Sequence, residues 1–160
     1  MPKLRIYLDT SVVSHLFHED APERKADTEE FFENAILPKA YETFISSVVL
    51  EELARTKNLV LRQRFLQATE HYQLDILPEG GNEVARLAAL YMDRGVIPFR
   101  NPEDALHVAY ATLFEMDSLV TWNFRHLARA KTAGLIGSIN LVEGYMRPLR
   151  LQTPLELLQP

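Results

Sequence analysis

Five residues in this sequence carry oxygen atoms that could hold a metal ion, and they occupy comparable places along the chain. They are Asp9, the adjacent Glu51 and Glu52, Asp104, and Asn123. The first and last directly follow short apolar runs typical of buried strands, the glutamates follow another such run by one helical turn, and Asp104 begins an apolar helix. Ligand sites of open α/β sheets lie beyond the carboxyl ends of the strands, so we expect these side chains to meet at one edge. Oxygen ligands from separate segments are what Mg²⁺ or Mn²⁺ requires, and the pattern therefore predicts a divalent-metal site.

Three of these residues also have a purely structural interpretation. Asp9 could cap the helix that follows it. Asp104 lies three residues after Asn101 and could be the distal member of a capping box. Asn123 could be a cap or turn residue. Their shared placement at strand and helix ends favours the metal-site hypothesis over three independent structural roles.

The glutamates and a nearby histidine leave a choice open. Adjacent residues on a helix diverge by about 100°, so only one of Glu51 and Glu52 can face the site. The other is then a first-turn acid that complements the helix dipole. His107 lies on the same apolar helix as Asp104, and we interpret it as a buried core histidine rather than a ligand.

The apolar pattern alternates short β-like runs with longer helical runs, which predicts βαβ units around a parallel sheet. The expected strands cover 4–8, 42–46, 74–77, 118–122 and 138–142. The expected helices cover about 23–37, 48–53, 59–71, 82–94, 102–116 and 123–131, and a short terminal helix follows Pro154. The helix 102–116 is apolar nearly all round, so we expect it to be buried in the middle of the fold.

Length and composition predict one soluble domain. The 160 residues include no cysteine, which excludes disulfides, thiolate chemistry and cysteine-bound zinc. No stretch approaches the roughly 18 apolar residues that span a bilayer, and we expect a cytoplasmic protein. We assign residues 1–143 to the domain proper and 144–160 to a C-terminal tail of the same domain.

Charge is unevenly distributed along the chain. The formal net charge is −5, which is not typical of an ordinary nucleic-acid-binding protein. Residues 19–33 carry seven acids, whereas residues 121–150 carry five cations against a single acid, Glu143. A second basic stretch covers residues 55–64. This polarity allows an acidic catalytic face with basic flanks for phosphates, although each cluster could also be an ordinary solvated surface.

Four segments, in this order, resemble the PIN domain family and, within it, the VapC-like toxins of toxin–antitoxin pairs. The segments are Asp9-Thr10-Ser11, residues 44–53, residues 104–111 and residues 119–127. The resemblance implies a parallel sheet of about five strands with helices on both sides. It also implies Mg²⁺- or Mn²⁺-dependent cleavage of RNA, a partner antitoxin that covers the acidic site, and a homodimer.

The resemblance also assigns roles to individual residues. The family's glutamate stands immediately before a leucine or isoleucine, which selects Glu52. The catalytic set is then Asp9, Glu52, Asp104 and Asn123, of which the three acids bind the metal. Thr10 and Thr121 are expected to hold these groups in orientation.

Asn123 departs from the family pattern, since many members carry aspartate there. An amide oxygen can coordinate a metal, but it supplies no charge and cannot act as a base. The alternative hypothesis is therefore a non-catalytic PIN-like module that binds RNA or a partner protein. A metal-dependent phosphatase is a third hypothesis, but its usual Asp-x-Asp motif is not met because Ser11 occupies the second acidic position.

Overall fold

A five-stranded parallel sheet forms the centre of the fold, in a computed structural model that describes residues 2–123 and 129–158. The strands lie in the order β3-β2-β1-β4-β5, and every neighbouring pair is parallel. They are β1 (Arg5–Leu8), β2 (Glu42–Ile45), β3 (Asp75–Ile76), β4 (Ser118–Val120) and β5 (Arg150–Gln152). The expected α/β fold with about five parallel strands is confirmed.

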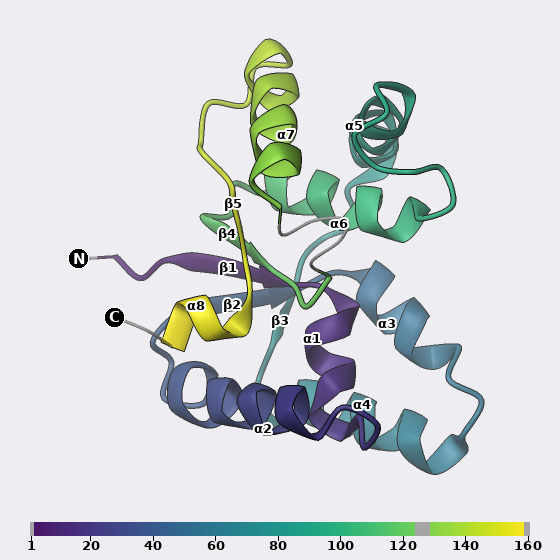
Figure 1. Ribbon diagram of the computed structural model, residues 1–160, viewed down its shortest axis with the longest axis vertical. Helices are drawn as coiled ribbons and strands as arrows, with labels where there is room; N and C mark the ends of the chain where they lie inside the picture. The colour runs from purple at the N-terminus through teal and green to yellow at the C-terminus, as the bar shows by residue number, and fades with distance from the viewer. Residues whose placement is uncertain (1, 124–128, 159–160) are drawn as a thin grey trace.

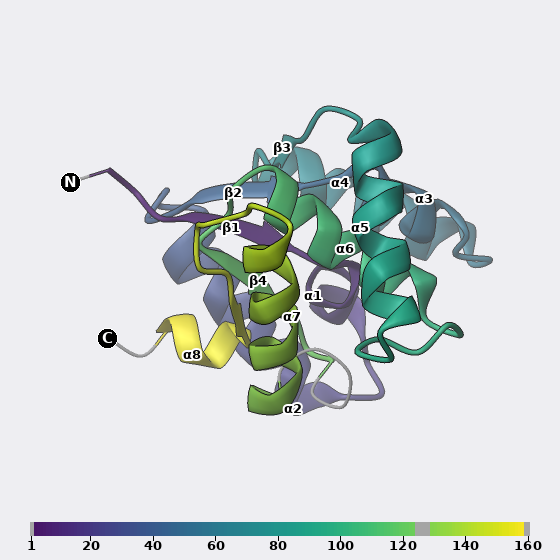
Figure 2. The same cartoon turned by 90° about the horizontal axis from the view of Figure 1, so that it is seen from above.

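Helices cover both faces of this sheet. The α-helices are α1 (Thr10–Ser14), α2 (Pro22–Phe31), α3 (Ser47–Ala54), α4 (Leu59–His71), α5 (Gly81–Asp93), α6 (Pro102–Leu113), α7 (Ala130–Val142) and α8 (Pro154–Leu158). A 3₁₀ turn, η1 (His15–Phe17), extends α1, and a π-helical turn, η2 (Phe32–Ile36), extends α2. Figures 1 and 2 show α5, α6 and α7 on one side of the sheet and α1, α2 and α4 on the other. None of the described helices is long and apolar enough to cross a membrane.

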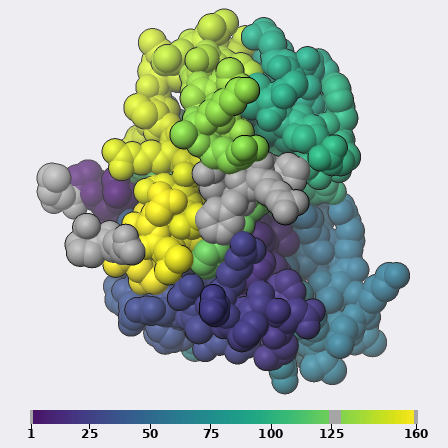
Figure 3. All heavy atoms as spheres, in the orientation of Figure 1, coloured from purple at the N-terminus to yellow at the C-terminus, as the bar shows by residue number. Residues whose placement is uncertain are grey.

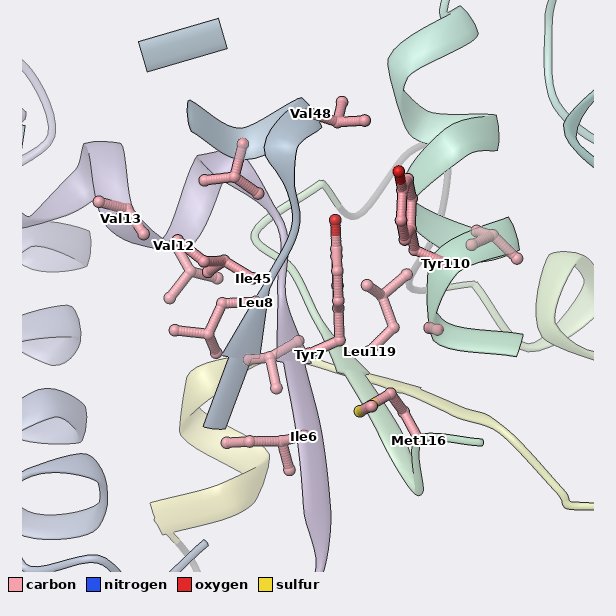
Figure 4. Close-up of a cluster of buried hydrophobic side chains, with 14 of the residues drawn as sticks. Ile6, Tyr7, Leu8, Val12, Val13, Ile45, Val48, Tyr110, Met116 and Leu119 are labelled. Carbon is pink, nitrogen blue, oxygen red and sulfur yellow. The ribbon is translucent and has the colours of Figure 1, made fainter. Parts of the chain in front are cut away.

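The central strand β1 is buried on both faces along its three apolar residues, as is usual in a parallel sheet covered by helices. Ile6, Tyr7 and Leu8 are fully buried. Figure 4 shows that Ile6 and Leu8 point to the side of α1, whereas the Tyr7 ring points to the opposite side, toward Tyr110 of α6. Helix α6 is buried over most of its length, as its apolar sequence predicted.

The order of the strands reverses at β1. The chain moves from β1 to β2 and β3 on one side, and then returns to place β4 and β5 on the other. Leu8 pairs with Val120 at the carboxyl ends of β1 and β4. Such a reversal leaves a crevice beyond the strand ends, which is where ligands bind in open α/β sheets.

One prediction for the last part of the chain was wrong, and another lies mostly outside the described residues. Residues 138–142 are not a strand but the second half of α7, and the fifth strand is instead 150–152. Ile136, Ile139 and Asn140 are buried at helical spacing, and this packing outweighs the low helix propensity of the two glycines in α7. The predicted helix 123–131 lies partly outside the described residues; Asn123 is not helical, and α7 begins at Ala130.

Candidate metal centre

Asp9 lies directly after β1 and is almost completely buried, with 3% of its surface exposed. It occupies the N-cap position of α1 but makes no side-chain capping hydrogen bond. Instead, Ser11 Oγ donates to one carboxylate oxygen at 2.5 Å, and Thr121 Oγ1 donates to the other. Burial raises the pKa of Asp9, while the charge of His107 and these hydrogen bonds act in the opposite direction. Ser11 of α1 and Thr121 directly after β4, rather than a capping bond, therefore orient this carboxylate.

Residues after β4 connect Asp9 to the start of α6. Thr121 Oγ1 accepts a hydrogen bond from the backbone N–H of Asn123 at 2.9 Å. Asn123 Nδ2 in turn donates to Asp104 Oδ2 at 3.0 Å. Asn101 makes no side-chain capping bond at the start of α6, so a capping box does not account for the position of Asp104. A continuous path of hydrogen bonds thus runs from Asp9 to Asp104.

Glu52 approaches the same region from α3. Its Oε1 atom accepts hydrogen bonds from Thr10 Oγ1 at 2.6 Å and from His107 Nε2 at 2.7 Å. Burial acts to raise the pKa of Glu52, but the hydrogen bond and charge of His107, together with Thr10, leave that pKa below its ordinary value. The neighbouring Glu51 is exposed. Of the two adjacent glutamates, the structure brings only Glu52 into contact with residues of the candidate site.

A buried network supports Glu52 from behind. The Tyr7 hydroxyl lies 2.7 Å from His107 Nδ1 and 2.6 Å from Ser46 Oγ. Ser46 Oγ also accepts the capping hydrogen bond from the backbone N–H of Val48 at 3.2 Å. The N-cap of α3 and the carboxylate that α3 carries are thus tied into one network.

The three acids lie within electrostatic reach of one another. The pKa of Asp104 is raised to about 6 by burial and by the negative charges of Asp9, Glu52 and Glu103, with His107 opposing them. Like charges disfavour each other's ionised form, and the effect requires that they be close or share a poorly solvated region. Segments far apart in sequence therefore bring three acids into one region of concentrated negative charge.

An ion pair lies beside this acidic region. Arg55, directly after α3, contacts Glu103, in the first turn of α6, at 3.0 Å. The charge of Arg55 also lowers the pKa of Glu52. Its side chain is 64% exposed, so the guanidinium group is accessible from solvent.

The donor chemistry of the site fits a hard divalent cation. Carboxylate and amide oxygens are available from Asp9, Glu52, Asp104 and Asn123, and the repulsion among the acids is what a cation would relieve. Among residues 2–123 and 129–158, however, no three His, Asp or Glu side chains converge closely enough to hold one ion as they stand. A shared ion would therefore require side-chain rotation or bridging water between some of these groups.

The sequence alone did not identify two contributors to the site, Ser11 and Tyr7. Ser11 both donates to Asp9 and accepts from the backbone N–H of Trp122 at 2.9 Å, so it joins the ends of β1 and β4. Its hydroxyl two residues after an aspartate was a local signal for this contact. His107 is buried as predicted, but it also contacts Glu52, and its position one turn after Asp104 on α6 indicated a shared face.

An acidic cluster beyond the carboxyl ends of a parallel sheet, at the point where strand order reverses, defines a class of α/β proteins with a polar site at that edge. The sequence matches the PIN domain family over residues 6–131. The chain belongs to this family.

Two solved structures share the fold over almost the whole chain. VapBC2 from Rickettsia felis, bound to a DNA fragment from its promoter, is 17% identical with a TM-score of 0.56 and covers 94% of this chain and 98% of its own. FitAcB from Neisseria gonorrhoeae is 16% identical with a TM-score of 0.53 and the same coverage. At these identities the similarity is one of fold. Among curated protein sequences, none matches this chain significantly.

Proposed function

We propose that this protein is an endoribonuclease that hydrolyses RNA phosphodiester bonds in the cytoplasm with the help of Mg²⁺ or Mn²⁺. The observation that carries the proposal is the grouping of three mutually repelling acids, directly after β1 and on α3 and α6, each oriented by hydrogen-bond donors. A fold that only had to be stable would gain nothing from this repulsion.

In this proposal each residue has a distinct task. Asp9 and Asp104 bind the divalent ion, and Glu52 binds it directly or through water and orients the attacking water molecule. Thr10 and Thr121 fix the carboxylates through the hydrogen bonds described above. The chemistry that the ion supplies when bound is activation of water and neutralisation of charge on the scissile phosphate.

Asn123 supports a second candidate, a PIN-like module that binds RNA or a protein without cleaving it. The amide brings no charge to the metal, and its Nδ2 group is already engaged with Asp104. In the nuclease proposal the same hydrogen bond keeps Asp104 in a fixed orientation. The two candidates differ in whether metal produces cleavage.

A partner protein and self-association belong to the same proposal. We propose that an antitoxin covers the acidic site and that the free protein is a homodimer. The likeness to VapBC2 and FitAcB supports the antitoxin, and the resemblance to VapC-like toxins supports both. Co-expression with the product of a neighbouring reading frame would test the antitoxin directly.

The nuclease proposal is tested with purified protein and a panel of labelled RNAs in Mn²⁺, Mg²⁺ or EDTA. We expect cleavage with either metal and none with EDTA. A phosphate monoester assayed in parallel should remain intact, which separates a nuclease from a phosphatase. Cleavage that persists in EDTA, or the absence of cleavage across single-stranded and structured RNAs, would contradict the proposal.

A further inference from the structure

A hollow of about 230 Å³ lies between the loop after α5 and the start of α7. It is lined by Gly95, Val96, Pro98, Arg129, Lys131, Thr132 and Leu135. Figures 2 and 3 show the α5 and α7 regions side by side on this part of the molecule. We call it the cationic hollow, because the segments that form its walls, 94–101 and 129–135, contain four Lys or Arg residues and no acid.

The cations of these segments are available for a ligand. Arg100, Arg129 and Lys131 are exposed. Within residues 2–123 and 129–158 they form no ion pair, whereas Arg55, Arg86 and Arg147 each pair with a carboxylate. Unpaired cations beside an open hollow attract anionic groups, and both arginine and lysine bind phosphate.

An exposed aromatic ring stands on the same segment. Phe99 is 68% exposed and directly precedes Arg100. A large apolar ring in solvent next to an arginine is the combination on which unpaired nucleic-acid bases stack. Double-stranded RNA does not offer such a base, since its bases are stacked within the helix.

Both walls continue directly into the candidate metal centre. Phe99 lies five residues before Asp104, and Arg129 lies six residues after Asn123. Asp104 and Asn123 are hydrogen-bonded to each other at 3.0 Å. A chain advances at most about 3.5 Å per residue, so Phe99 lies within about 18 Å of Asp104 and Arg129 within about 21 Å of Asn123. A bound strand could therefore reach from the cationic hollow to the acids within a few nucleotides.

We propose that the cationic hollow and Phe99 form a binding subsite for single-stranded RNA next to the acidic site. Arg100, Arg129 and Lys131 bind phosphates, and Phe99 stacks on one base. The subsite would explain how an acidic protein holds a polyanion close to its carboxylates. This inference rests on the proposed function, because it takes RNA as the substrate of the adjacent site.

The test is binding of a fluorescently labelled 12-nucleotide single-stranded RNA, measured by anisotropy in EDTA and again in Ca²⁺. Arg129→Ala/Lys131→Ala should weaken binding by about tenfold, which corresponds to about 1.4 kcal/mol. The dependence of log K on log salt should also flatten by about 1.4, because each lost phosphate contact on a single strand contributes about 0.7. The matched control is Lys3→Ala/Arg150→Ala, which removes the same charge from the amino end of the sheet and should leave both quantities near wild type.

Phe99 is tested by a pair of substitutions. Phe99→Leu keeps an apolar side chain but removes the ring, and should weaken binding by roughly tenfold. Phe99→Tyr keeps the ring and should restore wild-type affinity. A duplex RNA of the same sequence should not distinguish the two variants. Circular dichroism confirms that each variant is folded.

The inference is overturned if Arg129→Ala/Lys131→Ala matches its control in both affinity and salt dependence, or if the wild-type protein binds no single-stranded RNA in either buffer. Failure of the nuclease proposal has a different signature. If the protein binds RNA through these residues but does not cleave it in Mn²⁺, the subsite proposal stands and the nuclease proposal is wrong. If the protein cleaves RNA with metal but its RNA binding is insensitive to all these substitutions, the nuclease proposal stands and the subsite proposal is wrong.

Discussion

At the amino end of the sheet, Asp117 and Arg5 are held by an opposite charge or by backbone groups. Asp117 accepts a hydrogen bond from the backbone N–H of Arg5 at 2.8 Å and an ion pair from Arg147 at 3.0 Å. At the carboxyl end, by contrast, the carboxylates of Asp9, Glu52 and Asp104 repel one another, and the pKa of Asp104 is raised to about 6. The same parallel sheet thus carries one edge where an acid is paired with a cation and another where acids repel one another.

The difference separates what the fold needs from what the proposed reaction needs. Residues at the amino end should contribute to stability and not to cleavage. Residues at the carboxyl end should contribute to cleavage while lowering the stability of the metal-free protein. Four substitution experiments test this contrast, from the largest expected effect to the smallest.

The first experiment removes a charge from each edge. Asp9→Asn and Asp104→Asn should each lower RNA cleavage by about 1,000-fold, because several kcal/mol of charge stabilisation by the ion are lost. Asp117→Asn should leave the cleavage rate close to wild type. Rates are measured on one labelled RNA in Mn²⁺. If Asp117→Asn were as damaging as the other two, the contrast between the edges would be wrong.

The second experiment compares the adjacent glutamates of α3. Glu52→Gln should lower cleavage by about 100-fold, within the range for a group that assists proton transfer from water. Glu51→Gln removes the same charge one residue away, from an exposed side chain, and should have little effect. The reverse outcome would move the site to the other face of α3.

The third experiment measures stability in EDTA. The folded state holds the Asp104 proton more tightly than the unfolded state, because the folded pKa is about 6 and the ordinary value is 3.8. The ionised Asp104 carboxylate therefore lowers the free energy of unfolding. This loss is absent below about pH 4, grows between about pH 4 and pH 6, and is complete above about pH 6. Two pKa units correspond to about 3 kcal/mol, and partial solvent screening reduces this to about 1–2 kcal/mol.

Asp104→Asn should therefore stabilise the metal-free protein by about 1–2 kcal/mol at pH 7.5 and have almost no effect at pH 4. Urea denaturation at the two pH values measures the difference. Asp117→Asn serves as the opposite-edge control and should destabilise by about 1 kcal/mol at pH 7.5, since it weakens a charge-assisted contact. If both variants were destabilised equally, the two edges of the sheet would not differ in their effect on stability.

The smallest expected effect is at Asn123. If its side chain contacts the ion, Asn123→Asp should tighten Mn²⁺ binding by about 1 kcal/mol, or several-fold. The gain from a nearby full charge is partly cancelled by repulsion from Asp104. Calorimetry on both proteins measures the affinity. Identical values would place residue 123 outside direct contact with the ion.

The first two-thirds of the fold could be predicted because each element has a local signal. Pro102 at the start of α6, the apolar run of β1 and the periodic apolar residues of α5 all agree with the structure. The second half of α7 was predicted wrongly because residues 138–142 alternate in polarity like a strand. Asn140 in fact lies buried and hydrogen-bonds with Tyr91 and Thr112, partners distant in sequence that no local window includes.

The site could be predicted as a set of residues but not as a set of contacts. Strand and helix ends indicated Asp9 and Asp104, and the family motif indicated Glu52. The bonds that orient these acids come from hydroxyl groups such as Thr121, whose importance depends on where β4 lies next to β1. Side-chain orientation is a property of the packed sheet, so it becomes visible only after the strands are in register.

The hydrogen bonds that orient the acids also determine when in folding the site can form. Thr121 reaches Asp9 across 112 residues of chain, and His107 reaches Tyr7 across 100. Contacts at such sequence separation require large loops to close first, and they form only when much of the native topology is present. We expect early folding species to lack the arranged carboxylates and to be spared their mutual repulsion. The acidic site would then be assembled only as the chain completes its native structure.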